Sequence, residues 1–249
     1  MNVMCWSGGK DSTASIILDH TKNGHQIDLI IISLLYFDKK RKIYAEHPEH
    51  IEFIFKAKKV FEDWGYKVVM LDVEHDYMYW FYKKRTNRCK NKDNVGKYYG
   101  FLLSGLCELT PEKKYTIDRY LKKLGKHTQY VGIAIDEPER LDVAHRGGKI
   151  SLLEKFNYTE DDAKKLCEEY DLLSPVYAFT KRQGCWFCPN STIGQLQHVY
   201  ETHPELWAEL EKLDLEHNVV SRRFKRGLTL KQIKELFDDR KLRGCDSAS

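Results

Sequence analysis

The chain has 249 residues, of which 42% are hydrophobic and 12% aromatic, enough to build a packed core, which excludes a disordered or low-complexity protein. The 41 Lys and Arg residues nearly balance the 37 Asp and Glu residues, so the net charge of +4 does not by itself indicate a nucleic-acid partner. The longest apolar run covers residues 29–37, about half of the ~20 residues that cross a bilayer, so we expect no membrane span and no membrane partner.

Strands and helices alternate in the first part of the chain. Apolar runs bounded by turn residues predict strands at 2–6, 27–36 and 66–73, and helical spacing predicts helices at 13–22 and 48–64. The run at 27–36 is rich in β-branched residues and Leu, as in strands that are buried on both faces. This order predicts an α/β fold with a doubly wound, mostly parallel sheet, whose ligands bind at the carboxyl ends of the strands.

The pattern continues and then becomes helical. We expect a helix at 111–124, a core strand at 129–135, a helix at 160–170, and helical segments near 191–201, 204–217 and 229–242. A capping sequence at Thr159 opens the helix at 160–170. We therefore expect an α/β domain at 1–180 and a second domain at 181–249, which holds a cysteine loop and a helical C-terminal cap.

The most informative stretch is Ser-Gly-Gly-Lys-Asp-Ser, between the first strand and the first helix. Its two glycines let the backbone turn so that successive N–H groups face an anion, and the helix N-terminus adds partial positive charge. In this interpretation Lys10 binds phosphate, the serines donate hydrogen bonds, and Asp11 caps the helix or orients the loop. The alternative is an ordinary Gly-Gly turn before a capped helix. The predicted phosphate-binding residues are Ser7, Gly8, Gly9, Lys10, Asp11 and Ser12.

This loop resembles the PP-loop of the adenine nucleotide alpha-hydrolase superfamily, and the chain is most similar to its phosphoadenosine phosphosulfate (PAPS) reductase branch. Three later stretches resemble that branch in the same order: Gly105–Cys107, Gly132–Arg140 and Gly184–Pro189. The resemblance implies a parallel sheet that binds an adenine nucleotide, ATP or PAPS. It also implies an enzyme that acts at the α-phosphate or at the attached sulfate, so the domain at 1–180 is expected to bind the nucleotide.

The resemblance also assigns nucleotide contacts. It places the phosphates on the loop, with Lys10 as a catalytic cation, and the base near Ser33 at the end of the second strand. Asp136, Glu137 and Arg140 follow a core strand and are placed to face the nucleotide. Arg140 would bind phosphate, and the two carboxylates would hold Mg²⁺ if ATP is used. The alternative for this acidic turn is plain solvent exposure.

Two features depart from the reductase pattern. Ala134 stands where reductases carry an Arg, and the tail reads Arg-Gly-Cys-Asp in place of the reductase motif Glu-Cys-Gly-aliphatic-His. Cys245 in this tail is either a catalytic thiol or part of an unstructured terminus. Two chemistries compete: sulfonucleotide reduction, with thioredoxin as partner, and ATP-dependent adenylation and thiolation of tRNA or DNA, with a sulfur donor protein. A non-catalytic nucleotide-binding accessory protein is the third interpretation.

The chain has seven cysteines. Because its first residues lack the basic and apolar regions of a targeting peptide, we expect reduced thiols in the cytoplasm rather than a disulfide framework. The C-x-x-C pair Cys185 and Cys188 is typical of thiolates that share a metal or a cluster. The resemblance implies that Cys107 joins them at a [4Fe–4S] cluster, with Cys89 or Cys245 as fourth ligand or with one iron left open. A Zn²⁺ site and a thioredoxin-like redox pair are the alternatives.

Basic residues gather in two segments, 83–97 and 222–226, each of which has aromatic residues close by. Clustered cations beside aromatics suit a phosphate backbone with unstacked bases, and the alternative is a solvated charged face. Other thiols and imidazoles are given structural roles, because their spacing fits no metal site. These are Cys5 and Cys167 in the core, and His47, His50, His75, His127 and His203 at the surface or in loops.

Overall fold

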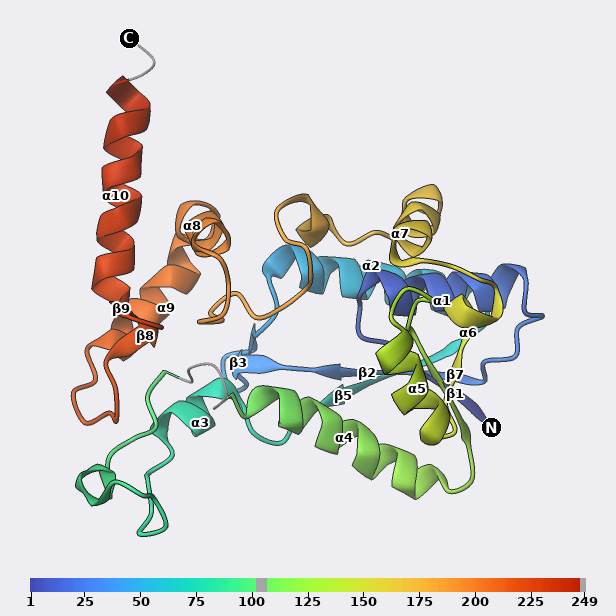
Figure 1. The fold of residues 1–249 in the computed structure, drawn as a ribbon, viewed down its shortest axis with the longest axis horizontal. Coiled ribbons are helices and arrows are strands. Elements are labelled where there is room, and N and C mark those ends of the chain that lie inside the picture. Colours follow the sequence, from blue (N-terminus) through green and yellow to red (C-terminus); the bar gives the residue numbers. More distant parts are fainter. Residues whose placement is uncertain (102–106, 247–249) are drawn as a thin grey trace. The chain divides into compact units, whose positions relative to one another are not determined.

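The computed structural model describes the backbone of residues 1–101 and 107–246, and the side chains of these residues up to 239 (Figure 1). The chain forms two compact units: the first comprises 1–35, 46–74 and 111–183, and the second comprises 36–45, 75–110 and 184–249. The expected domains, 1–180 and 181–249, are continuous in sequence, whereas each unit is assembled from three stretches. A unit built in this way has no single boundary along the chain.

The core of the first unit is a five-stranded sheet in which every neighbouring pair of strands is parallel (Figure 1). Its strands, in spatial order, are β5 (Lys67–Asp72), β2 (Leu29–Leu34), β1 (Asn2–Cys5), β6 (Thr128–Val131) and β7 (Ile150–Ser151). All six residues of β2 are buried, as expected for a central strand covered on both faces. The parallel α/β architecture predicted from the alternation of elements is confirmed.

The order of the strands reverses beside β1. The chain passes from β1 to β2 and outward to β5, and it then returns to place β6 on the other side of β1. Because the connections on the two sides leave the sheet in opposite directions, a crevice forms at the carboxyl ends of the two strands. The loop at Ser7–Ser12 and the loop after Val131 both lie at this edge of the sheet.

Helices cover both faces of the sheet. On one face lie α1 (Lys10–Thr21), α2 (Pro48–Asp63) and α7 (Glu160–Glu169), and α4 (Leu109–Leu124) covers the other (Figure 1). Val3, Leu29 and Ile31 pack against Leu121 of α4, as the alternation of side chains along a strand requires. The shorter elements of the unit are α5 (Pro138–Arg146), α6 (Leu152–Lys155) and the 3-10 helix η2 (Pro175–Ala178).

A buried carboxylate joins three elements of this unit. Asp19 on α1 is fully buried and accepts hydrogen bonds from the backbone N–H of Gln26 at 3.1 Å, the backbone N–H of Ile27 at 3.0 Å and the Tyr66 hydroxyl at 2.9 Å. Burial and the charge of Asp19 raise the pKa of Tyr66, so its hydroxyl stays a donor. These bonds tie the end of α1 to the residues that lead into β2 and β5.

Several predicted boundaries differ from the structure. The strand expected at 129–135 ends at Val131, because the chain turns there to pass the first turn of α1. Helix α1 begins at Lys10 rather than at residue 13, so the last residues of the predicted loop belong to the helix. The strand expected at 27–36 ends at Leu34, and the chain then enters a separate antiparallel pair in the second unit. This pair is β3 (Tyr36–Asp38) and β4 (Ile43–Tyr44).

The second unit has an aromatic core. Phe37, Tyr77, Trp186 and Phe187 are each 2% exposed or less, and neighbouring ring centroids lie 4.3 to 5.4 Å apart. The helices expected after residue 190 are present, and their role as a cap on the α/β domain stays a prediction. Among the described residues, no helix combines the length and apolar character required to cross a membrane. The remaining elements are α3 (Tyr77–Tyr82), η1 (Lys92–Asn94), α8 (Ile193–Thr202), α9 (Pro204–Asp214), β8 (Arg223–Lys225), β9 (Leu228–Thr229) and α10 (Leu230–Asp246).

Candidate functional site

The loop between β1 and α1 is a tight turn that ends on a helix without a side-chain cap. Gly8 has a φ of +81°, a conformation that residues with side chains rarely adopt. A Cβ atom on Gly8 would also lie 2.7 Å from Nε2 of His50. Gly9 is the N-cap residue of α1 and offers no side chain to the helix N–H groups. The first turn of α1 therefore has N–H groups left for other partners, an anion among them.

The two serines of the loop hold its shape. Ser12, only 5% exposed, accepts a hydrogen bond from the backbone N–H of Ser7 at 3.2 Å and donates one to the carbonyl of Gly9 at 3.1 Å. The two hydroxyl oxygens are 3.1 Å apart, and that of Ser7 also accepts the N–H of Gly9 at 3.2 Å. The two serine hydroxyl groups that the sequence predicts as phosphate ligands therefore lie next to each other, and both form hydrogen bonds within the loop.

Gly132, the residue after β6, packs directly on the first turn of α1. A Cβ atom on Gly132 would lie 2.4 Å from the backbone nitrogen of Ser12 and 2.6 Å from the backbone carbonyl carbon of Asp11. Both distances are shorter than a van der Waals contact, and backbone atoms cannot rotate away as a side chain can. Only glycine lets the two loops approach this closely.

A polar pocket of about 670 Å³ opens at this edge of the sheet, within the first unit. Three acidic and four basic side chains line it. Its volume is in the range of sites for small ligands, roughly 300–1,000 Å³. The lining residues are Ser7, Gly9, Lys10, Asp11, Ser12, Gly132, Glu137, Arg140, Glu160, Tyr177, Lys181, Arg182 and Gln183.

Lys10 is held by two carboxylates inside the pocket. Its Nζ lies 2.8 Å from Oδ1 of Asp11 and 3.0 Å from Oε2 of Glu160. Burial favours the neutral amine, but the hydrogen bonds and charges of these carboxylates outweigh it and raise the pKa of Lys10. Burial raises the pKa of Asp11, although Lys10 opposes the change. Lys10 is therefore a cation at neutral pH, and a bound anion would compete with two carboxylates for it.

Three carboxylates converge beside this lysine. One oxygen atom from each of Asp11, Glu137 and Glu160 lies within 4.8 Å of the other two. Glu137 and Arg140 line the pocket and form an ion pair with each other, and their predicted contact with a nucleotide stays a prediction. Carboxylate oxygens are the ligands that Mg²⁺ prefers. The pocket therefore contains a set of groups able to hold a divalent cation next to the glycine turn.

Two residues predicted to contact the nucleotide lie outside this pocket. The Asp136 carboxylate accepts the backbone N–H of Glu160 at 3.1 Å and so supports the start of α7. Ser33 lies inside β2 and is 1% exposed, and its hydroxyl has no hydrogen-bond partner among the described residues. Neither residue lines the pocket, and their assignment to the nucleotide stays a prediction.

A histidine expected at the surface is buried behind the loop. His50, in the first turn of α2, is 1% exposed, and its Nδ1 lies 2.8 Å from the hydroxyl oxygen of Ser174. Burial lowers the pKa of His50 to about 3, with further contributions from Lys113 and His47. A neutral imidazole therefore packs against Gly8 at neutral pH. The prediction of a surface or loop position was wrong for His50, because residue spacing does not show that the first turn of α2 is buried. His47 does lie in a loop, as the N-cap residue of α2, and is 4% exposed.

Residues that sequence reasoning missed complete the pocket. The Tyr177 hydroxyl accepts the backbone N–H of Lys10 at 3.0 Å, and Nε2 of Gln183 donates to the carbonyl of Ser7 at 2.9 Å. Burial raises the pKa of Tyr177, so its hydroxyl keeps a proton to donate to an anion. The basic pair just before Gln183 is the one sequence signal for this side of the pocket.

Two cysteines belong to the core of the first unit. Cys167 is fully buried and donates to the carbonyl of Lys10 at 3.3 Å, and burial raises its pKa to about 12. Cys5 packs against the hydrophobic cluster that β1 and β2 form with α4, and burial raises its pKa as well. Both core assignments are confirmed, and thiols with raised pKa values are poor nucleophiles.

The predicted cluster ligands Cys107, Cys185 and Cys188 lie in the second unit. The backbone N–H of Cys188 donates to the carbonyl of Cys185 at 3.1 Å, and the indole N–H of Trp186 between them donates to the carbonyl of Tyr44 at 2.9 Å. Burial raises the pKa of Cys188, and the Cys107 thiol adds to the shift. Among the described residues, no three cysteine sulfurs lie within 4.8 Å of one another. Tetrahedral zinc with four thiolates needs sulfurs about 3.8 Å apart.

The candidates for a fourth ligand are less defined. The Cys89 thiol donates to the carbonyl of Asn91 at 3.0 Å, within the basic segment at 83–97. Cys245 lies on α10, but its side chain is outside the described residues, as are Gly105 and Leu106 of the motif that precedes Cys107. The roles of these cysteines stay predictions.

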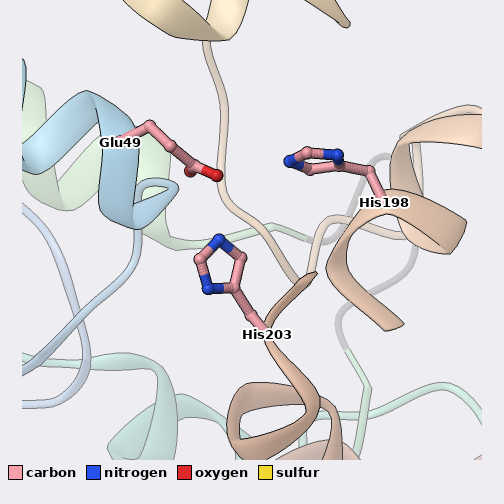
Figure 2. Close-up of side chains that lie close together, drawn as sticks. All are labelled: Glu49, His198 and His203. Carbon is pink, nitrogen blue, oxygen red and sulfur yellow. The ribbon is translucent and has the colours of Figure 1, made fainter. Parts of the chain in front are cut away.

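Two histidines of the second unit lie near each other (Figure 2). His198 on α8 and His203, the N-cap residue of α9, have ring centroids 6.2 Å apart. Glu49, drawn in the same figure, is in the first turn of α2 and belongs to the first unit. Two imidazoles supply too few ligands for a metal site, and we assign none to this pair.

No family model matches the sequence, and no curated protein is significantly similar to it. The function therefore has to be inferred from the residues of the pocket and from the motifs.

The packing of Gly132 against α1 predicts that Gly132→Ala is destabilising. The added methyl group would overlap backbone atoms of Ser12 and Asp11, so we expect the free energy of unfolding to fall by about 2 kcal/mol or more. Urea unfolding followed by circular dichroism measures the change. Gly147→Ala is the matched control, because Gly147 has a φ of −86° and a Cβ there would lie 3.4 Å from its nearest neighbour. Equal losses in the two variants would contradict the close packing.

The burial of His50 predicts that the free energy of unfolding depends on pH. The unfolded chain binds a proton at His50 near its ordinary pKa of 6.5, but the folded chain binds one only at about 3. The free energy of unfolding should therefore fall as the pH decreases from 6.5 towards 3, by about 3 kcal/mol at about pH 4.5. Urea unfolding should show a smaller fall in His50→Gln than in the wild type, and the wild-type fall in the exposed control His145→Gln. A full fall in His50→Gln would mean that another group is responsible.

Proposed function

We propose that the first unit binds an adenine nucleotide and that the protein acts at its α-phosphate or, in PAPS, at the attached sulfate. The observation that carries the proposal is the position of Ser7–Ser12. These residues form a glycine turn before a helix without a side-chain cap. The turn lies where the strand order reverses, and it opens into a polar pocket. The resemblance of the motifs to PP-loop enzymes of the PAPS reductase family supplies the class of ligand, which a fold alone does not identify.

The pocket provides the groups that phosphates need. Its four cationic side chains, those of Lys10, Arg140, Lys181 and Arg182, would bind phosphate oxygens through charge-assisted hydrogen bonds. The backbone N–H groups in the first turn of α1 and the Tyr177 hydroxyl add neutral donors. Phosphate binding is therefore shared between the loop and residues from distant parts of the sequence.

The carboxylates of the pocket favour ATP over PAPS. Negative charge on these groups repels a nucleotide unless a cation is bound with it, and ATP reaches its enzymes as a magnesium complex. Asp11, Glu137 and Glu160 would hold Mg²⁺, which supplies positive charge to the phosphates. With these carboxylates engaged, Lys10 is released from its ion pairs and can bind phosphate.

The favoured reaction is ATP-dependent adenylation of an acceptor, followed by sulfur transfer. An oxygen of the acceptor attacks the α-phosphorus, the bond to the bridging oxygen breaks, and pyrophosphate leaves. Lys10 and Arg140 would stabilise the charge that develops on the phosphates. A sulfur nucleophile then attacks the acceptor carbon and displaces AMP.

Sulfonucleotide reduction is the second candidate. In that reaction a thiol attacks the sulfur atom of PAPS, the bond between that sulfur and the phosphate oxygen breaks, and adenosine bisphosphate leaves. A second thiol, from thioredoxin, then attacks the resulting thiosulfonate, forms a disulfide and releases sulfite. Ala134, fully buried, stands at the position where the resembling reductases carry an Arg, so this chain offers one anion contact fewer. The substitution is a second reason to favour ATP.

We further propose that Cys107, Cys185 and Cys188 hold a [4Fe–4S] cluster in the second unit. Thiolates are the ligands that clusters and zinc share. The Cys107 thiol acts electrostatically on Cys188, and the resemblance to the PAPS reductase family favours a cluster over zinc. One iron without a protein ligand would bind the sulfur that is transferred.

Lys10→Ala should weaken the binding of Mg–ATP. The variant loses a charge-assisted hydrogen bond to phosphate, and we expect the Kd to rise about 10- to 100-fold. Isothermal titration calorimetry with Mg–ATP and with PAPS measures the change and identifies the preferred nucleotide. Lys22→Ala is the matched control, because Lys22 follows the opposite end of α1 and is exposed. An unchanged Kd in Lys10→Ala would contradict the proposed phosphate site.

The reaction products distinguish ATP-dependent adenylation from sulfonucleotide reduction. Adenylation predicts AMP and pyrophosphate from ATP in the presence of the acceptor, whereas reduction predicts sulfite from PAPS. The absence of all three products, with nucleotide binding retained, would identify a nucleotide-binding protein without turnover.

The cluster proposal predicts the metal content of the anaerobically purified protein. We expect about four iron and four sulfide ions per chain, and their loss in Cys185→Ser and Cys188→Ser. Cys167→Ser is the control, because this thiol is buried in the first unit and should leave the iron content unchanged. One zinc ion per chain and no iron would contradict the cluster.

A further inference from the structure

Three backbone segments of the second unit run side by side. Residues 83–85 pair with 97–99 through N–H to carbonyl hydrogen bonds of 2.8 and 3.0 Å. On the other side, Tyr98 pairs with residues 218–220 through two bonds of 2.8 and 2.9 Å. The segment at 97–99 therefore lies between two others, one of which leads directly into the second basic segment of the sequence.

These pairings join the two basic segments into one surface. We call residues 83–99 and 218–226 the basic ribbon. Asp93 is the only acidic residue in these two sequence segments. Seven of the cations of the basic ribbon are exposed: Lys84, Arg88, Lys90, Lys92, Arg222, Arg223 and Arg226. A concentration of exposed positive charge of this kind attracts a polyanion.

Lys225 does not belong to this exposed set. Its Nζ donates to the carbonyl of Pro189 at 2.9 Å and to the carbonyl of Ser191 at 2.6 Å. Both carbonyls follow the C-x-x-C turn, so Lys225 supports the cysteine loop and is not available to a ligand.

Aromatic rings lie among the cations. Cζ of Arg85 is 4.0 Å from the ring centroid of Tyr99. On α3, which directly precedes the ribbon, Tyr79 is 45% exposed and Tyr82 is 39% exposed. An exposed aromatic face beside a cation lets a base stack on the ring while the cation neutralises the adjoining phosphate.

We propose that the basic ribbon, together with the exposed tyrosines of α3, binds single-stranded nucleic acid, either RNA or DNA. A duplex presents phosphates but keeps its bases stacked inside, and an acidic protein segment presents charge without planar bases. Only an unpaired strand uses both the cations and the rings. Binding at this surface does not require the nucleotide pocket. That the bound strand is also the acceptor of the adenylation rests on the proposed function.

Fluorescence anisotropy of the full chain tests this proposal. The probes are fluorescein-labelled RNA and DNA strands of about 20 nucleotides and mixed sequence, and a duplex of the same length. We expect both single strands, or one of them, to bind at least about tenfold more tightly than the duplex, with an affinity that falls steeply between about 50 and 300 mM salt. No binding by the wild type, tighter binding of the duplex, or equal competition by polyglutamate would overturn the proposal.

Variants separate the contributions of charge and stacking. The double variant Lys84→Ala/Arg88→Ala should lower the slope of log affinity against log salt by about 1.4, because each phosphate contact with a single strand contributes about 0.7. Tyr79→Leu/Tyr82→Leu should weaken binding about tenfold and leave the slope unchanged. The control Lys164→Ala/Lys165→Ala removes two exposed charges from α7 and should bind as the wild type does. Equal losses in the control and in the ribbon variants would overturn the assignment of the surface.

The variant Lys10→Ala distinguishes nucleotide binding in the pocket from nucleic-acid binding on the basic ribbon. It should lose affinity for Mg–ATP and retain the wild-type affinity for the oligonucleotide, whereas Lys84→Ala/Arg88→Ala should show the opposite pattern. Circular dichroism spectra and melting curves of all variants verify that they are folded. If Lys10→Ala also lost the oligonucleotide, the ribbon would not be an independent binding surface, and the present assignment would be wrong.

Discussion

The close approach of two backbone segments, at the ends of β1 and β6, sets the geometry of the candidate site. Gly132 has no side chain, and the loop that it begins therefore lies directly on the first turn of α1. This contact occurs where the strand order reverses, so two loops that would otherwise diverge meet over one pocket. Because Glu137 and Arg140 follow Gly132 by only a few residues, the same close approach places them in the pocket.

Cationic side chains of the pocket are paired with its carboxylates. Its central cation, Lys10, is already bound by Asp11 and Glu160, and Arg140 is paired with Glu137. A ligand has to replace these pairs, which favours an anion that arrives with its own divalent cation over an anion alone. The side of the loop away from the pocket holds no such ion pair. His50 packs there against Gly8 and is neutral at neutral pH, so it adds no buried charge beside the glycine turn.

In the second unit, single sequence motifs contain both buried structural residues and residues proposed to bind ligands. In the Cys-Trp-Phe-Cys sequence the two middle residues enter the aromatic core, and this anchors the turn that carries the two thiols. In the basic segment at 222–226, Phe224 is buried and Lys225 supports the cysteine loop, while the three arginines are exposed. Some residues of each motif therefore pack in the core or support a loop, and only the others are available to a ligand.

The parallel α/β class, the position of the glycine turn and the packing of Cys5 and Cys167 could all be predicted from the sequence, because they depend on apolar periodicity and on residues adjacent in the chain. The sequence did not reveal the burial of His50, the contacts of Tyr177 and Gln183 with the loop, or the pairing of Tyr98 with residues 218–220. These features arise only in the folded chain, since they join residues that are far apart in the sequence. Local patterns record which residues prefer a helix or a strand, but not which distant backbone they will meet.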